Sequence, residues 1–307
     1  MVGMLDGRVA IVTGGGRGIG RSHCLELAAH GATVVVNDLG VGVHGEAADG
    51  SPAEQVVAEI VAKGGRALAD GTSVNDWAGT QALVEQTVDR FGRLDVLVNN
   101  AGIVRDRMLT ALTEEDLDAV LAVHVKGAVA LTAHACRFWR GVAKADGAVS
   151  GRVINTTSGT GLRGNLGQVP YGAAKAAVAN LTLIAAMEMA RYGVTVNAIS
   201  PVAYTRMVAT MPSMAGYQPE TGWDRLDPGN SSPLVAWLAS EQSGWLTGQV
   251  LRVDGGAVWR MQPWTSLGSP YQSLSGKRLD AAELGEGLRR LYGVLPDGLA
   301  GLVASKE

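Results

Sequence analysis

Three polar side chains in the middle of the chain have the types and spacing needed for proton transfer to an oxygen atom. Tyr171 and Lys175 are four residues apart in a segment with a helical pattern, so both can lie on one helix face. Ser158 precedes Tyr171 and ends an apolar run that is typical of a strand. A lysine ammonium favours the phenolate, so we expect Lys175 to lower the tyrosine pKa from about 10. Tyr171 then exchanges a proton with an alcohol or carbonyl oxygen that Ser158 holds.

That pair is common by chance on helix faces, and it gains meaning from a glycine-rich segment near the N-terminus. The apolar run 8–13 is typical of a buried strand, and a helical pattern follows the glycines. Glycines let a backbone turn tightly and approach a pyrophosphate, which the N–H groups at a helix start bind. A glycine-rich turn without a ligand is the simpler alternative. The strand–turn–helix context favours a dinucleotide site made by Gly14, Gly16, Arg17, Gly18, Ile19 and Gly20.

A second apolar run, residues 32–37, ends at Asp38. An acidic residue roughly 20 positions past the glycine loop accepts hydrogen bonds from the adenosine ribose and repels a 2′-phosphate. Asp38 therefore favours NAD over NADP, although Arg17 in the loop is a basic residue that can meet a 2′-phosphate. We expect NAD as the cofactor.

These motifs occur in the order and at the spacing of a known family. The segments 13–20 and 99–102 (Asn-Asn-Ala-Gly), then Ser158, Tyr171 and Lys175, resemble the short-chain dehydrogenase/reductase family over about residues 5–258. Within it the chain is most similar to the (3R)-hydroxyacyl-CoA dehydrogenase part of multifunctional enzyme type 2 and its bacterial relatives. The segments that carry this closer resemblance are 34–40, 99–107, 123–127, 164–168 and 206–207.

The resemblance implies a single-domain α/β fold: a Rossmann-type doubly wound parallel sheet of seven strands in the order 3-2-1-4-5-6-7, with helices on both faces. It implies that Lys175 also binds the nicotinamide ribose and that Thr205 binds the nicotinamide carboxamide. Further cofactor contacts are implied at Ser73, Val74, Asn100, Ala101, Gly102, Tyr171 and Pro201.

Two positions depart from the family pattern. Many members carry an asparagine in the helix after the fourth strand, where it belongs to a proton relay, and this chain has His124 there. His124 is either a relay residue or a packed histidine. After the third strand the family usually has an aspartate for the adenine ring, whereas this chain offers Thr72 or Ser73.

The pattern along the chain alternates strands and helices, which predicts right-handed crossovers and one parallel sheet covered on both faces. We expect strands near 8–13, 32–37, 66–69, 94–98, 151–157, 194–199 and 249–253, and helices near 18–30, 52–63, 76–91, 114–141, 171–191 and 231–239.

Residues 1–260 are predicted to form the NAD-binding catalytic domain, with a substrate lid at about 203–228 that contains Met207. Residues 261–307 are predicted to be an extension that packs on the core or on a neighbouring subunit. Asn165 and Gln168 are the expected polar contacts to a thioester or amide. Arg105 and Arg107 either meet CoA phosphates or are solvated.

Composition narrows the partners. The 307 residues carry a net charge of −3, which gives no broad attraction to nucleic acid or to anionic membranes. The two cysteines indicate no disulfide framework, and the five histidines show no metal-ligand spacing. No signal pattern and no apolar run long enough for a bilayer is apparent, so a cytoplasmic protein is expected. The resemblance implies a homodimer or a homotetramer.

The expected function is NAD-dependent interconversion of a secondary alcohol and a ketone, most simply 3-hydroxyacyl-CoA and 3-oxoacyl-CoA. A hydroxysteroid dehydrogenase or another short-chain alcohol dehydrogenase is the alternative, with a steroid-like substrate in the first case. A 3-oxoacyl carrier-protein reductase is disfavoured, because it normally uses NADPH and Asp38 opposes that cofactor. A non-catalytic NAD-binding scaffold is a different class, and the intact Ser158, Tyr171 and Lys175 argue against it.

Overall fold

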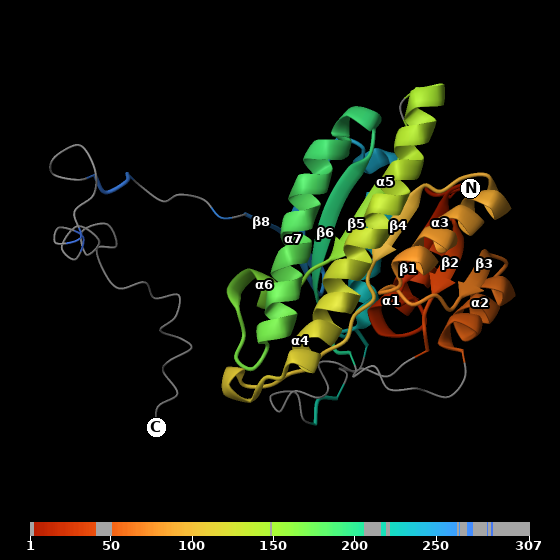
Figure 1. Ribbon diagram of the computed structural model, residues 1–307. Coiled ribbons are helices and arrows are strands. Elements are labelled where there is room, and N and C mark those ends of the chain that lie inside the picture. Colours follow the sequence, from red (N-terminus) through yellow and green to blue (C-terminus); the bar gives the residue numbers. More distant parts are fainter. Residues whose placement is uncertain are drawn as a thin grey trace. The chain divides into compact units, whose positions relative to one another are not determined.

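The computed structural model describes residues 3–40, 51–147, 149–205, 216–218, 222–262, 264, 269–272, 281 and 284. Their strands form one sheet in the order β3-β2-β1-β4-β5-β6-β7-β8 (Figure 1). The first seven pair in parallel, which confirms the predicted order. The strands are β1 (Val9–Thr13), β2 (Thr33–Asn37), β3 (Arg66–Asp70), β4 (Val96–Asn99), β5 (Arg152–Thr156), β6 (Thr195–Val202), β7 (Val250–Asp254) and β8 (Ala257–Met261).

Strand β8 was not predicted, and it pairs antiparallel with β7 at the edge of the sheet. The two strands are joined by Gly255 and Gly256, and Gly255 has a φ of +56°. A two-residue glycine connection is a hairpin signal that the sequence already contained. The predicted seven strands are therefore correct in order, and the sheet has one more.

The helices are α1 (Gly18–Ala29), α2 (Pro52–Ala62), α3 (Trp77–Phe91), α4 (Glu114–Leu121), α5 (Gly127–Asp146), α6 (Gly159–Arg163), α7 (Val169–Met189) and α9 (Ser232–Ala239). Short 3-10 turns are η1 (Leu109–Ala111), η3 (Ala190–Tyr192), η5 (Pro228–Ser231) and η6 (Glu241–Ser243). Of these, α6 and the 3-10 turns were not expected, because segments of three to five residues are too short to show a helical period.

Successive strand residues point to opposite faces of the sheet, and this alternation builds two cores. Ala10 and Val12 of β1 pack with α1, α2 and α9, whereas Ile11 between them packs with α3, α5 and α7. The helices accordingly lie in two layers with the sheet between them (Figure 1). A sheet covered on both faces needs strands that are apolar throughout, which explains the unbroken apolar runs of the sequence.

The helix predicted over 114–141 is interrupted. A π-helical turn, η2 (Ala122–Lys126), separates α4 from α5, and α5 continues to Asp146. An extra residue in a helical turn bulges the backbone, and such turns are frequent at functional sites. His124 lies inside this turn. The position where the chain departs from the family pattern is thus also a position of irregular backbone.

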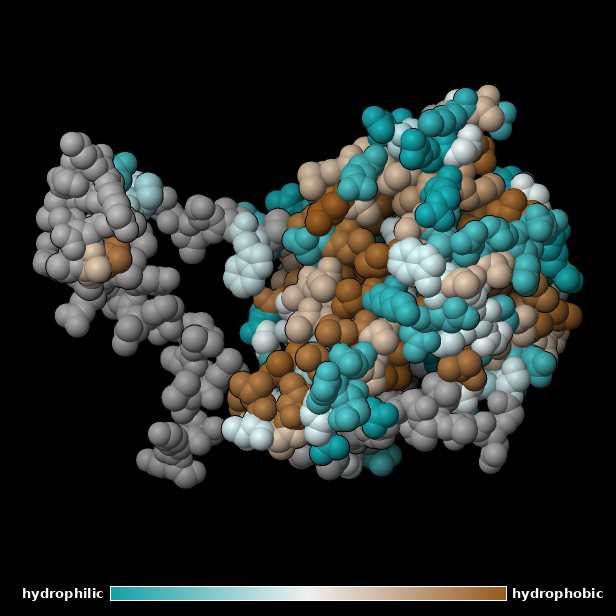
Figure 2. All heavy atoms as spheres, in the orientation of Figure 1, coloured by the Kyte–Doolittle hydropathy of each residue, from teal (hydrophilic) through white to brown (hydrophobic). Residues whose placement is uncertain are grey.

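Two helical segments, Glu114–Asp146 and Val169–Tyr192, are long and apolar enough to cross a membrane by length and composition alone. The expectation that no such run exists is therefore wrong on that criterion. Half of the first segment's most apolar window and 39% of the second's are buried inside the structure, as in helices that cover a sheet. Apolar side chains also gather on the outer face over α5 and α7 (Figure 2), where Ile184 and Met187 are exposed.

The chain divides into two compact units, Met1–Met261 and Gln262–Glu307. Most of the second unit, and residues 206–215 and 219–221 of the predicted lid, lie outside the described residues. Met207 is among them. The roles predicted for the lid and for the extension stay predictions, as does the homo-oligomer.

Candidate active site

Helix α7 brings Tyr171 and Lys175 to the carboxyl end of the central strands. The Lys175 Nζ donates a hydrogen bond to the main-chain oxygen of Thr156, at the end of β5, over 2.6 Å. It lies 5.6 Å from the centre of the Tyr171 ring. Lys175 is buried, and this burial lowers its pKa to about 7. At neutral pH the lysine is therefore charged in only part of the molecules.

Ser158 connects β5 to the short helix α6. Its Oγ caps α6 by accepting a hydrogen bond from the main-chain N–H of Thr160 over 3.3 Å. Its side chain also hydrogen-bonds the side chain of Tyr171. The structure therefore brings Ser158, Tyr171 and Lys175 together, as the sequence predicts.

The pKa of Tyr171 shifts in the direction opposite to the one expected. Burial of the phenol raises its pKa, the hydrogen bond from Ser158 lowers it, and the negative charge of Asp106 raises it. Lys175 does not reverse this balance, because a lysine whose own pKa is about 7 carries little positive charge when a phenol titrates. The prediction of a lowered tyrosine pKa is wrong for the chain without bound ligands.

His124 packs against Tyr171 from the π-helical turn. The two rings meet edge to face, with 5.4 Å between their centres. The His124 Nε2 lies 2.8 Å from the main-chain oxygen of Ile103. Burial, together with the positive charge of Lys175, lowers the pKa of His124 to about 3. His124 is therefore a neutral imidazole at physiological pH. Its part in a proton relay stays a prediction.

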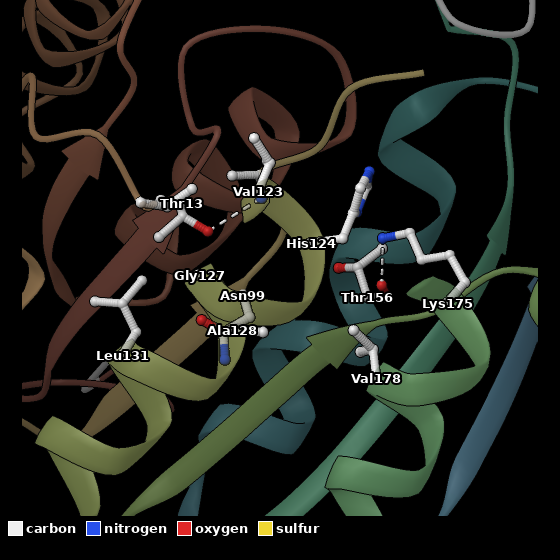
Figure 3. Close-up of a pocket in the computed structure, with 12 residues that line it drawn as sticks. Thr13, Asn99, Val123, His124, Gly127, Ala128, Leu131, Thr156, Lys175 and Val178 are labelled. Atoms are coloured by element: carbon white, nitrogen blue, oxygen red, sulfur yellow. Dashed lines mark hydrogen bonds between the residues drawn. The ribbon is translucent and has the colours of Figure 1, made fainter. Parts of the chain in front are cut away.

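A narrow cavity lies beneath these side chains (Figure 3). Figure 3 shows the hydrogen bond from the Lys175 amino group to the main-chain oxygen of Thr156. Three buried atoms of its wall have no hydrogen-bond partner among the described residues: Asn99 Oδ1, His124 Nδ1 and Thr156 Oγ1. The cavity therefore presents polar atoms from three different elements to a small polar molecule.

The glycine loop has the tight backbone that a pyrophosphate site needs. A Cβ on Gly20 would lie 2.0 Å from the oxygen of Gly14, and one on Gly14 would lie 2.8 Å from the Cα of Ala101. Gly18 has a φ of +53° and open space above it, at the first residue of α1. Ile19 follows in the same helix. The residues present fit a dinucleotide phosphate at this helix start.

Asp38 lies directly against this loop. Its Oδ2 accepts a hydrogen bond from the Gly16 N–H and its Oδ1 accepts one from the Gly40 N–H, each over 2.8 Å. A Cβ on Gly16 would lie 2.8 Å from the same carboxylate oxygen. A hollow beside the loop is lined by Gly16, Arg17, Gly18, Arg21, Gln55, Val56 and Glu59. The structure thus brings Asp38 into contact with the glycine loop.

The Asn-Asn-Ala-Gly motif holds β4 to the glycine loop. Asn100 Nδ2 donates to the main-chain oxygens of Thr13 and Gly14, over 3.0 and 3.2 Å. The Thr13 hydroxyl in turn accepts from the N–H groups of Asn100 and Ala101, both over 3.0 Å. Asn99 points to the sheet interior and donates to Asn155 Oδ1 over 2.8 Å. The motif therefore braces the end of β4 against the glycine loop.

The other predicted cofactor contacts are less concentrated. Val74 is buried in the cavity wall, and the Ser73 hydroxyl bonds Asn75 Oδ1 over 2.8 Å. Pro201 lies inside β6, where it pairs only with β7 because β5 has ended. Thr205 follows β6 after three residues. Among the described residues, no three His, Cys, Asp or Glu side chains are grouped as metal ligands would be.

The two predicted substrate contacts bind each other. The Gln168 Oε1 accepts from Asn165 Nδ2 over 2.9 Å and from the Thr160 hydroxyl over 3.0 Å. The Gln168 Nε2 donates to Asp106 Oδ2 over 2.7 Å. Both amide groups thus have protein partners, and their contact with a substrate stays a prediction. Arg107 does not stand free for CoA either, because its Nε bonds Asp116 Oδ2.

Sequence reasoning missed three residues of this site. The Thr13 hydroxyl accepts hydrogen bonds from main-chain N–H groups. Thr156 contributes its main-chain oxygen, which accepts from Lys175. A main-chain oxygen leaves no signal in the sequence. Asp106 stands among charged residues in a loop, where the pattern gives no reason to select it.

Comparisons with known proteins agree with this geometry. Residues 8–215 match the family model described as short chain dehydrogenase. The chain is 42% identical to hydroxyacyl-CoA dehydrogenase ChsB1 of Mycobacterium tuberculosis over 84% of this chain and 81% of that protein. It is 39% identical to mouse peroxisomal multifunctional enzyme type 2, over 86% of this chain and only 34% of that longer protein. A crystal structure of a short chain dehydrogenase from Mycobacterium avium superimposes with a TM-score of 0.84 at 52% identity, covering 96% of this chain and 98% of that one.

Proposed function

The chain belongs to the short-chain dehydrogenase family, and on that premise we propose that it is an NAD-dependent 3-hydroxyacyl-CoA dehydrogenase. It is an oxidoreductase that acts on CH–OH groups. The proposal adds that the cofactor is NAD and that the substrate is a 3-hydroxyacyl-CoA. The observation that carries the proposal is the hydrogen-bonded placement of Ser158 on Tyr171, with Lys175 one helical turn away.

Proton transfer in this site runs through the Tyr171 hydroxyl. Ser158 and Tyr171 share a hydrogen bond, so a substrate oxygen that replaces this bond can accept from both hydroxyls. The raised pKa of Tyr171 keeps the phenol protonated at neutral pH in the free chain. The phenol is therefore poised to give its proton to a ketone oxygen, and alcohol oxidation requires loss of that proton at higher pH.

Lys175 has two functions in the proposal. Its hydrogen bond to the Thr156 oxygen fixes the ammonium at the floor of the site, where it lies beside both Tyr171 and His124. Because burial lowers its pKa to about 7, Lys175 can give up and regain a proton near neutral pH. It can therefore resupply the tyrosine after each proton transfer.

NAD, when bound, supplies the hydride acceptor for alcohol oxidation. The glycine loop would hold its pyrophosphate and Asp38 its adenosine ribose. A 2′-phosphate bound beside this carboxylate would bring a like charge, which supports NAD over NADP. Arg17 and Arg21 line the hollow beside the loop. Their positive charges favour a 2′-phosphate, whereas the negative charge of Asp38 opposes it.

The acyl-CoA assignment is supported by two relatives. Both the mycobacterial hydroxyacyl-CoA dehydrogenase and the mouse multifunctional enzyme cover more than four fifths of this chain. The chain spans only 34% of the length of the mouse enzyme, so the proposal is confined to the dehydrogenase activity.

The test is a direct assay of the purified protein. Reduced-nicotinamide absorbance would be followed with 3-hydroxyacyl-CoAs, free hydroxysteroids and simple secondary alcohols, each with NAD and with NADP. We expect turnover of acyl-CoAs with NAD. Turnover of free steroids or small alcohols alone would keep the chemistry and contradict the CoA assignment. Binding of NAD without any turnover would contradict the enzyme assignment and favour a scaffold.

A further inference from the structure

A chain of hydrogen bonds ties together the two loops that flank Tyr171. One loop follows β4 and contains Asp106, and the other joins α6 to α7 and contains Gln168. The Arg107 N–H donates to the Gly167 oxygen over 2.8 Å, and Arg107 and Gln168 form an isolated parallel bridge. The Asp106 carboxylate then accepts from the Gln168 side chain over 2.7 Å. These two residues are 62 positions apart in the sequence.

Gln168 passes this connection on to the proposed catalytic residues. It is buried, with 3% of its surface exposed, and it stands directly before α7, which carries Tyr171. Its main-chain oxygen accepts from the Gly172 N–H over 2.7 Å. Its side-chain oxygen holds the Thr160 hydroxyl, and the Thr160 N–H is bound by Ser158. The amide of one residue thus joins the start of the tyrosine helix to the serine turn.

We propose that Asp106 is a positioning residue: through Gln168 it holds Ser158 and Tyr171 in register, and it places a negative charge beside the start of α7, which carries Tyr171. This inference rests on the proposed function, because it assigns a role within the same reaction. The role is not that of a proton donor, since the Asp106 contact is to Gln168 and not to a reacting atom.

The charge acts among few neighbours. Lys175 of α7 and His124 of the π-helical turn face Tyr171 as well, and His124 is neutral. The adjacent Arg107 is occupied by Asp116 of α4. The negative charge of Asp106 raises the pKa of Tyr171. Removing that charge should therefore lower the pKa of Tyr171.

Two substitutions separate the hydrogen bond from the charge. Asp106→Asn keeps an oxygen that accepts from Gln168 and loses the charge, whereas Asp106→Ala loses both. We expect Asp106→Ala to lower kcat by about tenfold through misplacement of the reacting groups, with the Kd for NAD within about twofold of wild type. Asp106→Asn should recover most of kcat. Gln168→Met, which keeps the volume and removes the amide, should repeat the loss and serves if Asp106→Ala does not fold.

The effect of the Asp106 charge is measured as a change in the pKa of Tyr171. The tyrosinate absorbance of each protein would be titrated, with the same protein lacking the Tyr171 hydroxyl (Tyr171→Phe) subtracted. Asp106→Asn should lower the pKa of Tyr171 by a few tenths of a pH unit at low salt, and the difference should shrink at high salt. The acid limb of the pH profile for alcohol oxidation should move by the same amount. Asp118→Asn, the same change at an exposed site on α4, is the matched control and should match wild type.

The titration needs no substrate, so failure of the proposed function and failure of this inference are distinguishable. A wild-type protein that turns over no acyl-CoA would contradict the proposed function, and the Asp106→Asn titration would still decide whether Asp106 acts on Tyr171. An unchanged Tyr171 pKa in Asp106→Asn would overturn the inference. A kcat of Asp106→Ala within about twofold of wild type would overturn it as well.

Discussion

The His124 ring lies so close to Gly102 that it fills the space that a side chain at position 102 would need. A Cβ built on Gly102 would lie 2.4 Å from Cε1 of the His124 ring. The imidazole is buried there and packs edge-on against Tyr171. The last residue of the Asn-Asn-Ala-Gly motif therefore helps to place the histidine that stands beside the proposed proton donor.

Gly102→Ala should displace the His124 ring and strain the loop after β4. Overpacking of this kind costs about 1–3 kcal/mol, and we expect that loss in the free energy of unfolding measured with urea. Gly71→Ala is the matched control, because no heavy atom lies within 4 Å of the position its Cβ would occupy. Equal stability of the two variants would show that the His124 ring moves without cost.

His124→Gln should make the protein less sensitive to acid. The pKa of His124 is about 3 in the folded chain and about 6.5 in the unfolded chain, so the unfolded state binds more protons between these values. Stability that is fully present above pH 6.5 is lost as the pH falls. Between pH 6.5 and 4.5, wild type should lose about 2–3 kcal/mol more than the variant. His30→Gln, at a partly exposed imidazole, should follow wild type, and parallel curves for all three proteins would contradict the prediction.

Lys175→Met should change the pH dependence of stability on the alkaline side. Burial lowers the lysine pKa to about 7, whereas the unfolded value is about 10.4. The unfolded state therefore binds more protons in between, and wild type should gain up to about 1.4 kcal/mol per pH unit relative to the variant from pH 7 upward. Urea unfolding at several pH values measures this slope. Lys63→Met, at an exposed site, is the control, and its stability should follow the wild-type pH dependence.

Tyr171→Phe should abolish most turnover and leave cofactor binding intact. The change removes the transferable proton and little volume, and loss of general acid–base catalysis costs roughly 10²–10⁴ in rate. The Kd for NAD, measured by fluorescence titration, should stay near wild type. Tyr192→Phe is the control, since its hydroxyl accepts a hydrogen bond from Arg191 in the 3-10 turn beyond the far end of α7. Turnover above about a tenth of the wild-type rate in Tyr171→Phe would mean that another group transfers the proton.

Asp38→Asn should weaken the preference for NAD. The amide keeps an oxygen for the Gly16 N–H and removes the charge that opposes a 2′-phosphate. Because a like-charge contact costs several kcal/mol, the ratio of kcat/KM for NADP to that for NAD should rise by about tenfold or more. Steady-state rates with both cofactors test this, with Asp118→Asn as the control. A ratio that stays at the wild-type value would mean that Arg17 and Arg21 set the choice.

Much of the fold was predictable because its signals are local. Unbroken apolar runs that alternate with helical periods identified the seven strands of one parallel sheet, and the family resemblance implied their order. The glycine loop and Asp38 were identified from residue types whose conformational or charge properties depend little on distant contacts. Strand β8 was missed although its glycine turn was visible, because its five residues are mostly exposed and carry no clear apolar alternation.

The sequence by itself determined the seven parallel strands, the glycine loop with Asp38, and the grouping of Ser158, Tyr171 and Lys175. The tertiary structure alone decided how these groups ionise and what holds them. Burial beside β5 lowers the pKa of Lys175 to about 7. Burial of the phenol and the negative charge of Asp106 raise the pKa of Tyr171. Hydrogen bonds such as that from Gln168 to Asp106 join loops far apart in the sequence. The physical reason is that periodicity and turn chemistry act over a few residues, whereas desolvation and charge depend on every element that packs around a group.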